Sequence, residues 1–144
     1  RRHTRLQGDW SSDVCSSDLL INADDIRDSN LILWGDPQSN KLLQRIAPML
    51  PIKWDGKVIK VGDKTYDATK HVPVFIFLNP LNPSRYVVIN SGFTFPQYAG
   101  ASNSQQTPKL PDWAILDMSV PLAERVGGKG VVDANFFGEK WELK

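Results

Sequence analysis

The feature that most constrains the fold is a run of seven residues, 72–78, with the sequence VPVFIFL. A strand places successive side chains on opposite faces of a sheet, so this run presents branched aliphatic side chains on one face and Phe75 and Phe77 on the other. A strand that is apolar on both faces belongs inside a sheet that is covered on both sides. Pro73 cannot donate a ladder hydrogen bond, so we expect it at the entry of the strand.

Further strands are predicted on both sides of this run. They are expected at residues 31–34, 85–90, 113–116 and 131–137, with a hairpin over 52–61 that is closed by Asp55-Gly56 and extended by a turn into 64–66. Residues 23–29 read as a short polar helix or turn, and residues 79–83 as a connector rich in turn residues. Residues 95–112 lack apolar periodicity and are expected to form a long loop.

One amphipathic helix is predicted over residues 37–50. Asp36 is expected to cap it and Pro37 to occupy its first position. Its apolar face is expected to consist of Leu42, Leu43, Ile46, Met49 and Leu50, which recur at helical spacing, and Pro51 forbids continuation beyond Leu50. Pro48 in the last turn indicates that the helix frays or ends near Ala47.

These elements define the fold class. A length of 144 residues allows one domain. The element order favours an α/β or α+β fold, with a mixed β-sheet and one main amphipathic helix in a single small domain. Because only one good helix is available, the second face of the central strand must be covered by the long loop or by an upstream domain.

Composition excludes several partners and cofactors. The 17 basic and 16 acidic side chains leave a net charge of +1 without a block of like charges, so we do not expect a nucleic-acid partner. The longest apolar run has seven residues, far short of the roughly 20 that a membrane-spanning helix needs, so we expect no membrane partner. No phosphate-binding or dinucleotide fingerprint is present, and we expect no cofactor.

The first 19 residues, RRHTRLQGDWSSDVCSSDL, look foreign to the rest of the chain. They have no apolar period and no signal-peptide pattern. Residues 8–19 resemble the translation of a common short-read sequencing adapter, as found at the ends of gene models from metagenome assemblies. We therefore expect residues 1–19 to be a non-native, disordered extension, with a genuine disordered N-terminus as the alternative. Residues 20–144 would then be the tail of a larger protein.

Catalytic motifs are scarce in residues 20–144. The only cysteine, Cys15, lies in the foreign segment, and His71 is the one remaining histidine, so no metal site is expected. The Gly-x-Ser-x-Gly elbow of serine hydrolases is missing, and Ser91 reads as a turn residue at the end of a strand. His71 with Asp67 nearby is the sole candidate base, and a structural role is the simpler interpretation. We therefore predict no catalytic residue in this chain.

One turn has geometry that suits ligand binding. Residues 35–40 link a strand to the N-terminus of the predicted helix, where free N–H groups bind anions. Asp36 is expected to cap these groups itself and to repel a second anion. A polar or peptide ligand that also touches the 79–83 loop fits better. The candidate ligand-binding residues are Asp36, Ser39, Asn40, Asn79 and Asn82.

Several segments together resemble a known protein group. They are NLILWGDPQSN (30–40), NPLNP (79–83), RYVV (85–88), SGFTF (91–95), PKLPDWA (108–114) and FFGEKW (136–141). In this order they are similar to the C-terminal region of bacterial secreted serine peptidases of the prolyl oligopeptidase family, or of related α/β-hydrolases. The resemblance covers about residues 23–143.

The resemblance implies that the catalytic serine, acid and histidine lie upstream, since no residue here matches them. It implies a secreted or periplasmic accessory domain that completes, caps or assists substrate access to the catalytic domain of the same parent chain. Two alternatives remain open. One is a stand-alone binding module for a polar or peptide ligand at residues 36–40, and the other is a very small enzyme that uses His71.

Overall fold

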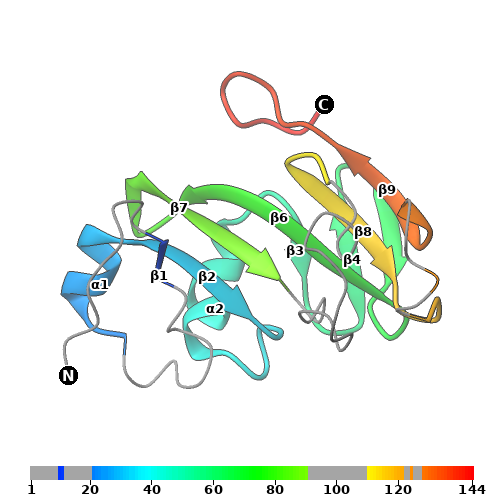
Figure 1. The fold of residues 1–144 in the computed structure, drawn as a ribbon, viewed down its shortest axis with the longest axis horizontal. Helices are drawn as coiled ribbons and strands as arrows, with labels where there is room; N and C mark the ends of the chain where they lie inside the picture. The colour runs from blue at the N-terminus through cyan, green and yellow to red at the C-terminus, as the bar shows by residue number, and fades with distance from the viewer. Residues whose placement is uncertain (1–9, 12–20, 91–109, 122–123, 125–127) are drawn as a thin grey trace.

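The computed structural model of the chain describes residues 10–11, 21–90, 110–121, 124 and 128–144. Two α-helices, one 3₁₀ helix and nine strands lie in these parts of the chain (Figure 1). In chain order they are β1 (Trp10–Ser11), α1 (Ala23–Asp28), β2 (Asn30–Trp34), α2 (Lys41–Ile46), η2 (Ala47–Met49), β3 (Lys53–Trp54), β4 (Val58–Val61), β5 (Lys64–Asp67), β6 (His71–Asn79), β7 (Asn82–Asn90), β8 (Trp113–Asp117) and β9 (Val131–Asn135).

The main sheet has six strands in the order β1-β2-β7-β6-β8-β9. The pairs β1-β2 and β2-β7 are parallel, and the other three pairs are antiparallel. The nine-residue strand β6 lies between β7 and β8, which confirms residues 72–78 as a central strand. Pro73 precedes Val74, where pairing with β7 begins, so its missing N–H leaves that ladder intact.

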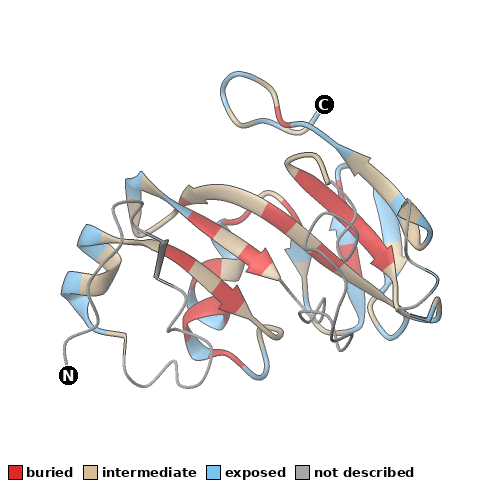
Figure 2. Ribbon diagram, viewed as in Figure 1, coloured by how far each residue is buried: buried red, intermediate tan, exposed pale blue. Residues whose placement is uncertain are grey.

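A second layer covers one face of the main sheet. It consists of α2, at the end of the sheet formed by β2 and β7, and of an antiparallel sheet with the order β3-β4-β5, at the end formed by β6 and β8 (Figures 1 and 2). Buried side chains of both layers form one core. They are Leu31, Leu33, Leu42, Leu43, Ile46, Leu50, Ile52, Ile59, Val61, Phe75, Val87, Ile89, Trp113, Ile115 and Phe137. The molecule is thus a mixed-sheet α+β fold, as predicted.

The opposite face of the main sheet is covered unevenly. Ala114 and Leu116 of β8 are fully buried and form a second, smaller cluster with Val72 and Val74 of β6. Farther along β6, Ile76 and Leu78 are only half-buried. The loop over residues 95–112 was one of the two covers predicted for this face, but its residues 95–109 lie outside the described part of the chain.

The predicted helix over residues 37–50 was wrong in its start and in its length. The structure has a turn at residues 37–39, a six-residue helix α2 capped by Asn40 and a 3₁₀ turn η2 that contains Pro48. Asp36 forms hydrogen bonds within the turn instead of capping the helix. The ending near Ala47 is confirmed, and Met49, expected on the apolar face, is 48% exposed. A proline in the last turn removes a helical donor and so shortens the helix.

The remaining elements follow the prediction closely. Helix α1 begins at a capping box in which the side chain of Asn22 accepts from the N–H of Asp25 and the side chain of Asp25 accepts from the N–H of Asn22. The strands predicted around 31–34, 64–66, 85–90 and 113–116 and the hairpin predicted over 52–61 are present, whereas the strand predicted over 131–137 ends at Asn135. Of residues 1–19, the structure describes only β1.

Candidate functional site

The turn after β2 is held by its own side chains. Gly35 has a φ of +89°, and a Cβ added there would lie 2.6 Å from Ser39 Oγ, so only glycine fits. The Asp36 carboxylate accepts hydrogen bonds from the backbone N–H groups of Gln38 (2.8 Å) and Ser39 (2.7 Å). Ser39 Oγ accepts from the N–H of Asp36 at 3.0 Å. The N–H groups of Gln38 and Ser39 are therefore already bonded to Asp36 and are not free for a ligand anion.

Asn40 joins the turn to the helix and the strand. Its side chain is 8% exposed. The Oδ1 atom accepts from the N–H of Leu43 at 2.9 Å, which caps α2, and Nδ2 donates to the Trp34 carbonyl at the end of β2 at 3.2 Å. Both ends of this amide are thus used to fix α2 against β2.

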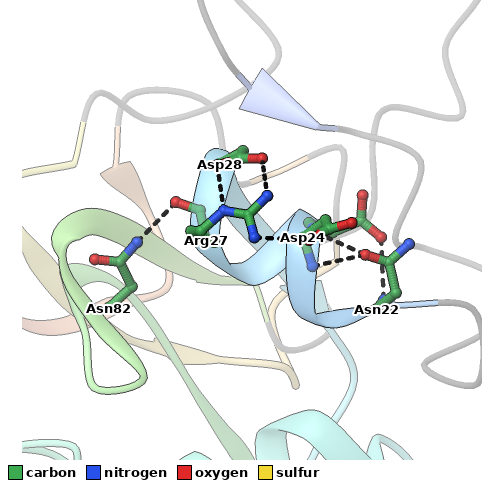
Figure 3. Close-up of polar contacts among 6 residues, drawn as sticks. Asn22, Asp24, Arg27, Asp28 and Asn82 are labelled. Carbon is green, nitrogen blue, oxygen red and sulfur yellow. Dashed lines mark hydrogen bonds and ion pairs between the residues drawn. The ribbon is translucent and has the colours of Figure 1, made fainter.

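The two asparagines of the 79–83 segment lie in the tight turn between β6 and β7. Asn79 is fully buried, its Oδ1 accepts from the N–H of Leu81 at 3.0 Å, and its Nδ2 has no hydrogen-bond partner among the described residues. Asn82 is more open. Its Nδ2 donates to the Arg27 carbonyl at 2.8 Å and ties the turn to the end of α1, as Figure 3 shows.

The structure does not bring the two predicted groups together. Asn82 contacts α1 just before β2 begins, whereas the Asp36–Ser39 turn follows the end of β2. Five strand residues at about 3.3 Å each separate them by about 16 Å. Asp36, Ser39 and Asn40 therefore form one group, and Asn79 and Asn82 form another at the opposite end of the strand. Ligand binding by either group stays a prediction.

A side-chain cluster that sequence reasoning missed links the small sheet to the edge of the main sheet. Asp133 Oδ2 of β9 accepts from Lys64 Nζ at 2.7 Å and from the Tyr66 hydroxyl at 2.5 Å, and both donors lie on β5. The two hydrogen bonds lower the pKa of Asp133, that from Lys64 most strongly. Burial, followed by the hydrogen bond to Asp133, raises the pKa of Tyr66 to about 12. The Tyr66 hydroxyl therefore stays protonated and is unsuited to act as a nucleophile.

His71 lies beside this cluster. Its ring meets that of Tyr66 edge-on, with 6.0 Å between the centroids. Its Nδ1 is 2.9 Å from the Asp67 backbone carbonyl, and because a carbonyl can only accept, Nδ1 is the donor. The Asp67 carboxylate instead accepts from the N–H and hydroxyl of Thr69. His71 and the Asp67 carboxylate are therefore not arranged as a catalytic base and its orienting acid.

The Asp133 cluster could not have been found from spacing, since Asp133 lies 69 positions from Lys64 and 67 from Tyr66. The only signal was a carboxylate within the strand-like sequence VVDAN.

Within the described ranges, no three His, Cys, Asp or Glu side chains gather as a metal site requires. Comparison with protein-family models, curated proteins and solved structures found no match. No helix in the described ranges is both long and apolar enough to cross a membrane.

Proposed function

We infer that this chain is a non-catalytic accessory domain of a larger serine hydrolase or peptidase-like protein, which it completes, caps or assists. The observation that carries this proposal is that the candidate polar side chains are engaged in holding the fold. Asp36 closes its own turn, Asn40 fixes α2 to β2, and His71 contacts the Asp67 backbone. The resemblance of residues 23–143 to the C-terminal region of such proteins indicates the kind of parent.

The geometry gives less support to the alternative, a stand-alone binding module at residues 36–40. A ligand at this turn would have to displace the Asp36 carboxylate from two backbone donors at 2.7 and 2.8 Å. It would also meet a negative charge. An anionic ligand is therefore disfavoured, and an uncharged ligand would have to compete with two charge-assisted hydrogen bonds.

The decisive experiment is to read the genomic DNA upstream of the Leu20 codon and to express the protein it encodes. We expect an open frame that contains Gly-x-Ser-x-Gly, and a parent enzyme whose hydrolysis of substrate is impaired when residues 20–144 are removed. A start codon close to Leu20 would refute the proposal. A parent enzyme that works equally well without residues 20–144 would also refute an assisting role.

The isolated chain provides a second test. It should hydrolyse an activated ester no faster than buffer does. Turnover that disappears in Ser91→Ala or His71→Ala would instead show that the chain carries its own catalytic site.

A further inference from the structure

The outer strands are β1 and β9 in the main sheet and β3 and β5 in the small sheet, and three of them, β9, β5 and β3, carry devices that block pairing with another strand. In β9, the pairing register shifts opposite the Ile115-Leu116 step, and Asp133 is engaged by β5. In β5, Lys64 and Asp67 place charges at the two ends. Strand β3 has only two residues. Irregular pairing, charges and shortness are the means by which proteins keep edge strands from pairing with other chains.

The fourth outer strand, β1, covers only the first two residues of β2, and the edge of β2 beyond them has none of these devices. Its sequence, NLILW, contains neither charge nor proline. Leu31 and Leu33 are fully buried on the core face, and Ile32 and Trp34 are half-buried on the other face. Strand β1 pairs only with Asn30 and Leu31, and no other strand in the described ranges lies along this edge. An uncharged strand that is apolar on both faces is typical of the interior of a parallel sheet.

The position of helix α1 suits a crossover connection between β2 and such a neighbouring strand. Parallel strands need a crossover connection, usually a helix. Helix α1 ends at Asp28, directly before β2, and Asn82 of the adjacent turn holds the Arg27 carbonyl (Figure 3). A strand that precedes α1 in the chain would therefore run parallel to β2, in the orientation that β1 adopts. On the interpretation that residues 1–19 are foreign, Trp10–Ser11 occupies the position of that strand.

We propose that in the parent chain the segment directly upstream of residue 20 forms a parallel strand along the whole outer edge of β2. This inference rests on the proposed function, because it requires a parent chain. The occupant is an extended segment of about five residues, matching β2, with apolar side chains toward the core face. The strand would continue the main sheet toward the preceding part of the parent protein.

The proposal is tested by comparing amide hydrogen exchange in the 144-residue chain with that in the full parent protein. Some β2 amides between Ile32 and Trp34 point away from β7. These amides should exchange on the order of 100-fold more slowly in the parent protein than in the 144-residue chain. The amides of β9, the outer strand at the other end of the main sheet, serve as the internal control and should change little.

A pair of matched variants of the parent sharpens the test. Ile32→Lys places a charge on β2 beside its uncovered edge, and Val132→Lys places one on β9, the outer strand at the other end of the same sheet. The slower exchange at β2 should be lost in Ile32→Lys and kept in Val132→Lys. Near-ultraviolet circular dichroism shows whether each variant folds. If Ile32→Lys does not fold, the wild-type comparison alone decides.

The possible failures are distinguishable. A parent hydrolase in which β2 exchanges as fast as in the printed chain overturns the added strand and leaves the accessory role intact. An upstream sequence without a hydrolase overturns both. Concentration-dependent protection of β2 in the printed chain would assign the edge to a second copy and overturn the proposal as well.

Discussion

Replacing Asn40 with alanine should destabilise the protein more than the loss of any other polar side chain of the 35–40 turn. The change removes the cap on the buried N–H of Leu43 and the donor to the Trp34 carbonyl. An N-cap is worth about 1 kcal/mol, and the lost second hydrogen bond at a part-buried carbonyl adds about 1 kcal/mol or slightly more. We expect a loss of about 2–3 kcal/mol in the free energy of unfolding.

Urea and thermal unfolding measure this loss. For a chain of this size, 2–3 kcal/mol corresponds to a fall in Tm of about 10 °C. Asn40→Ser keeps a capping oxygen and loses the amide donor to Trp34, so it should cost about 1 kcal/mol. Asn22→Ala is the matched control because Asn22 caps α1 at an exposed site, and it should cost about 1 kcal/mol or less.

Asp36→Ala decides between the two possible helix starts. The Asp36 carboxylate makes two exposed hydrogen bonds within the turn, so its loss should cost about 1 kcal/mol or less. If Asp36→Ala proves clearly more damaging than Asn40→Ala, the helix begins at Asp36 in solution and our assignment of the cap is wrong.

Four further predictions concern the pH dependence of stability at Tyr66 and at Asp133, the N-terminus and the open face of the main sheet. The raised pKa of Tyr66, about 12, means that its neutral hydroxyl stabilises the fold fully below about pH 10 and that this contribution disappears as the pH rises through 12, so ultraviolet titration should show a late tyrosine step that Tyr66→Phe removes. The lowered pKa of Asp133 means that its contribution is present above about pH 4 and is lost on further acidification, and Asp133→Asn should flatten that part of the stability profile. Deletion of residues 1–19 removes only a two-residue strand from the described structure and should leave Tm unchanged within about 2 °C, whereas a fall of several degrees would show that the segment docks. The half-buried residues Ile76 and Leu78 should make the folded chain bind a hydrophobic dye, and a monomer in light scattering that binds no dye would argue against a missing partner surface.

The sequence predicted the elements well where one local signal dominates. Residues 72–78 could occupy only a central strand, and Asp55-Gly56 could hardly form anything except a hairpin turn. The predicted helix start was wrong because the cap was placed at Asp36, four residues before the actual cap, Asn40. Local propensity favoured Asp36 followed by proline, whereas the structure uses Asn40 because it can reach both Leu43 and Trp34.

The layer made by β3, β4 and β5 was not predicted, although its strands were. An alternating pattern in the sequence shows that one face of a strand is buried but not which sheet covers it. The same limit applies to the candidate site. The turn around Asp36 follows from its residue types, but its separation from Asn82 depends on the parallel pairing of β2 with β7, which no short motif encodes.

The pairing of β2 with β7 also sets the order in which the chain can fold. Strands β6 and β7 are joined by a two-residue turn, so their hairpin can form from local contacts alone. The pairing of β2 with β7 instead brings Leu31 next to Val87, which is 56 positions away in the sequence. Closing so large a loop costs entropy before any contact compensates for it, so such pairings form late. We expect the β6-β7 hairpin to be the nucleus. Ile89→Val should therefore slow folding, while Leu33→Ala should mainly speed unfolding. During synthesis the apolar strand β2 emerges well before its partner β7. Its apolar side chains therefore stay unpaired for the longest time, which makes β2 the segment most prone to aggregation.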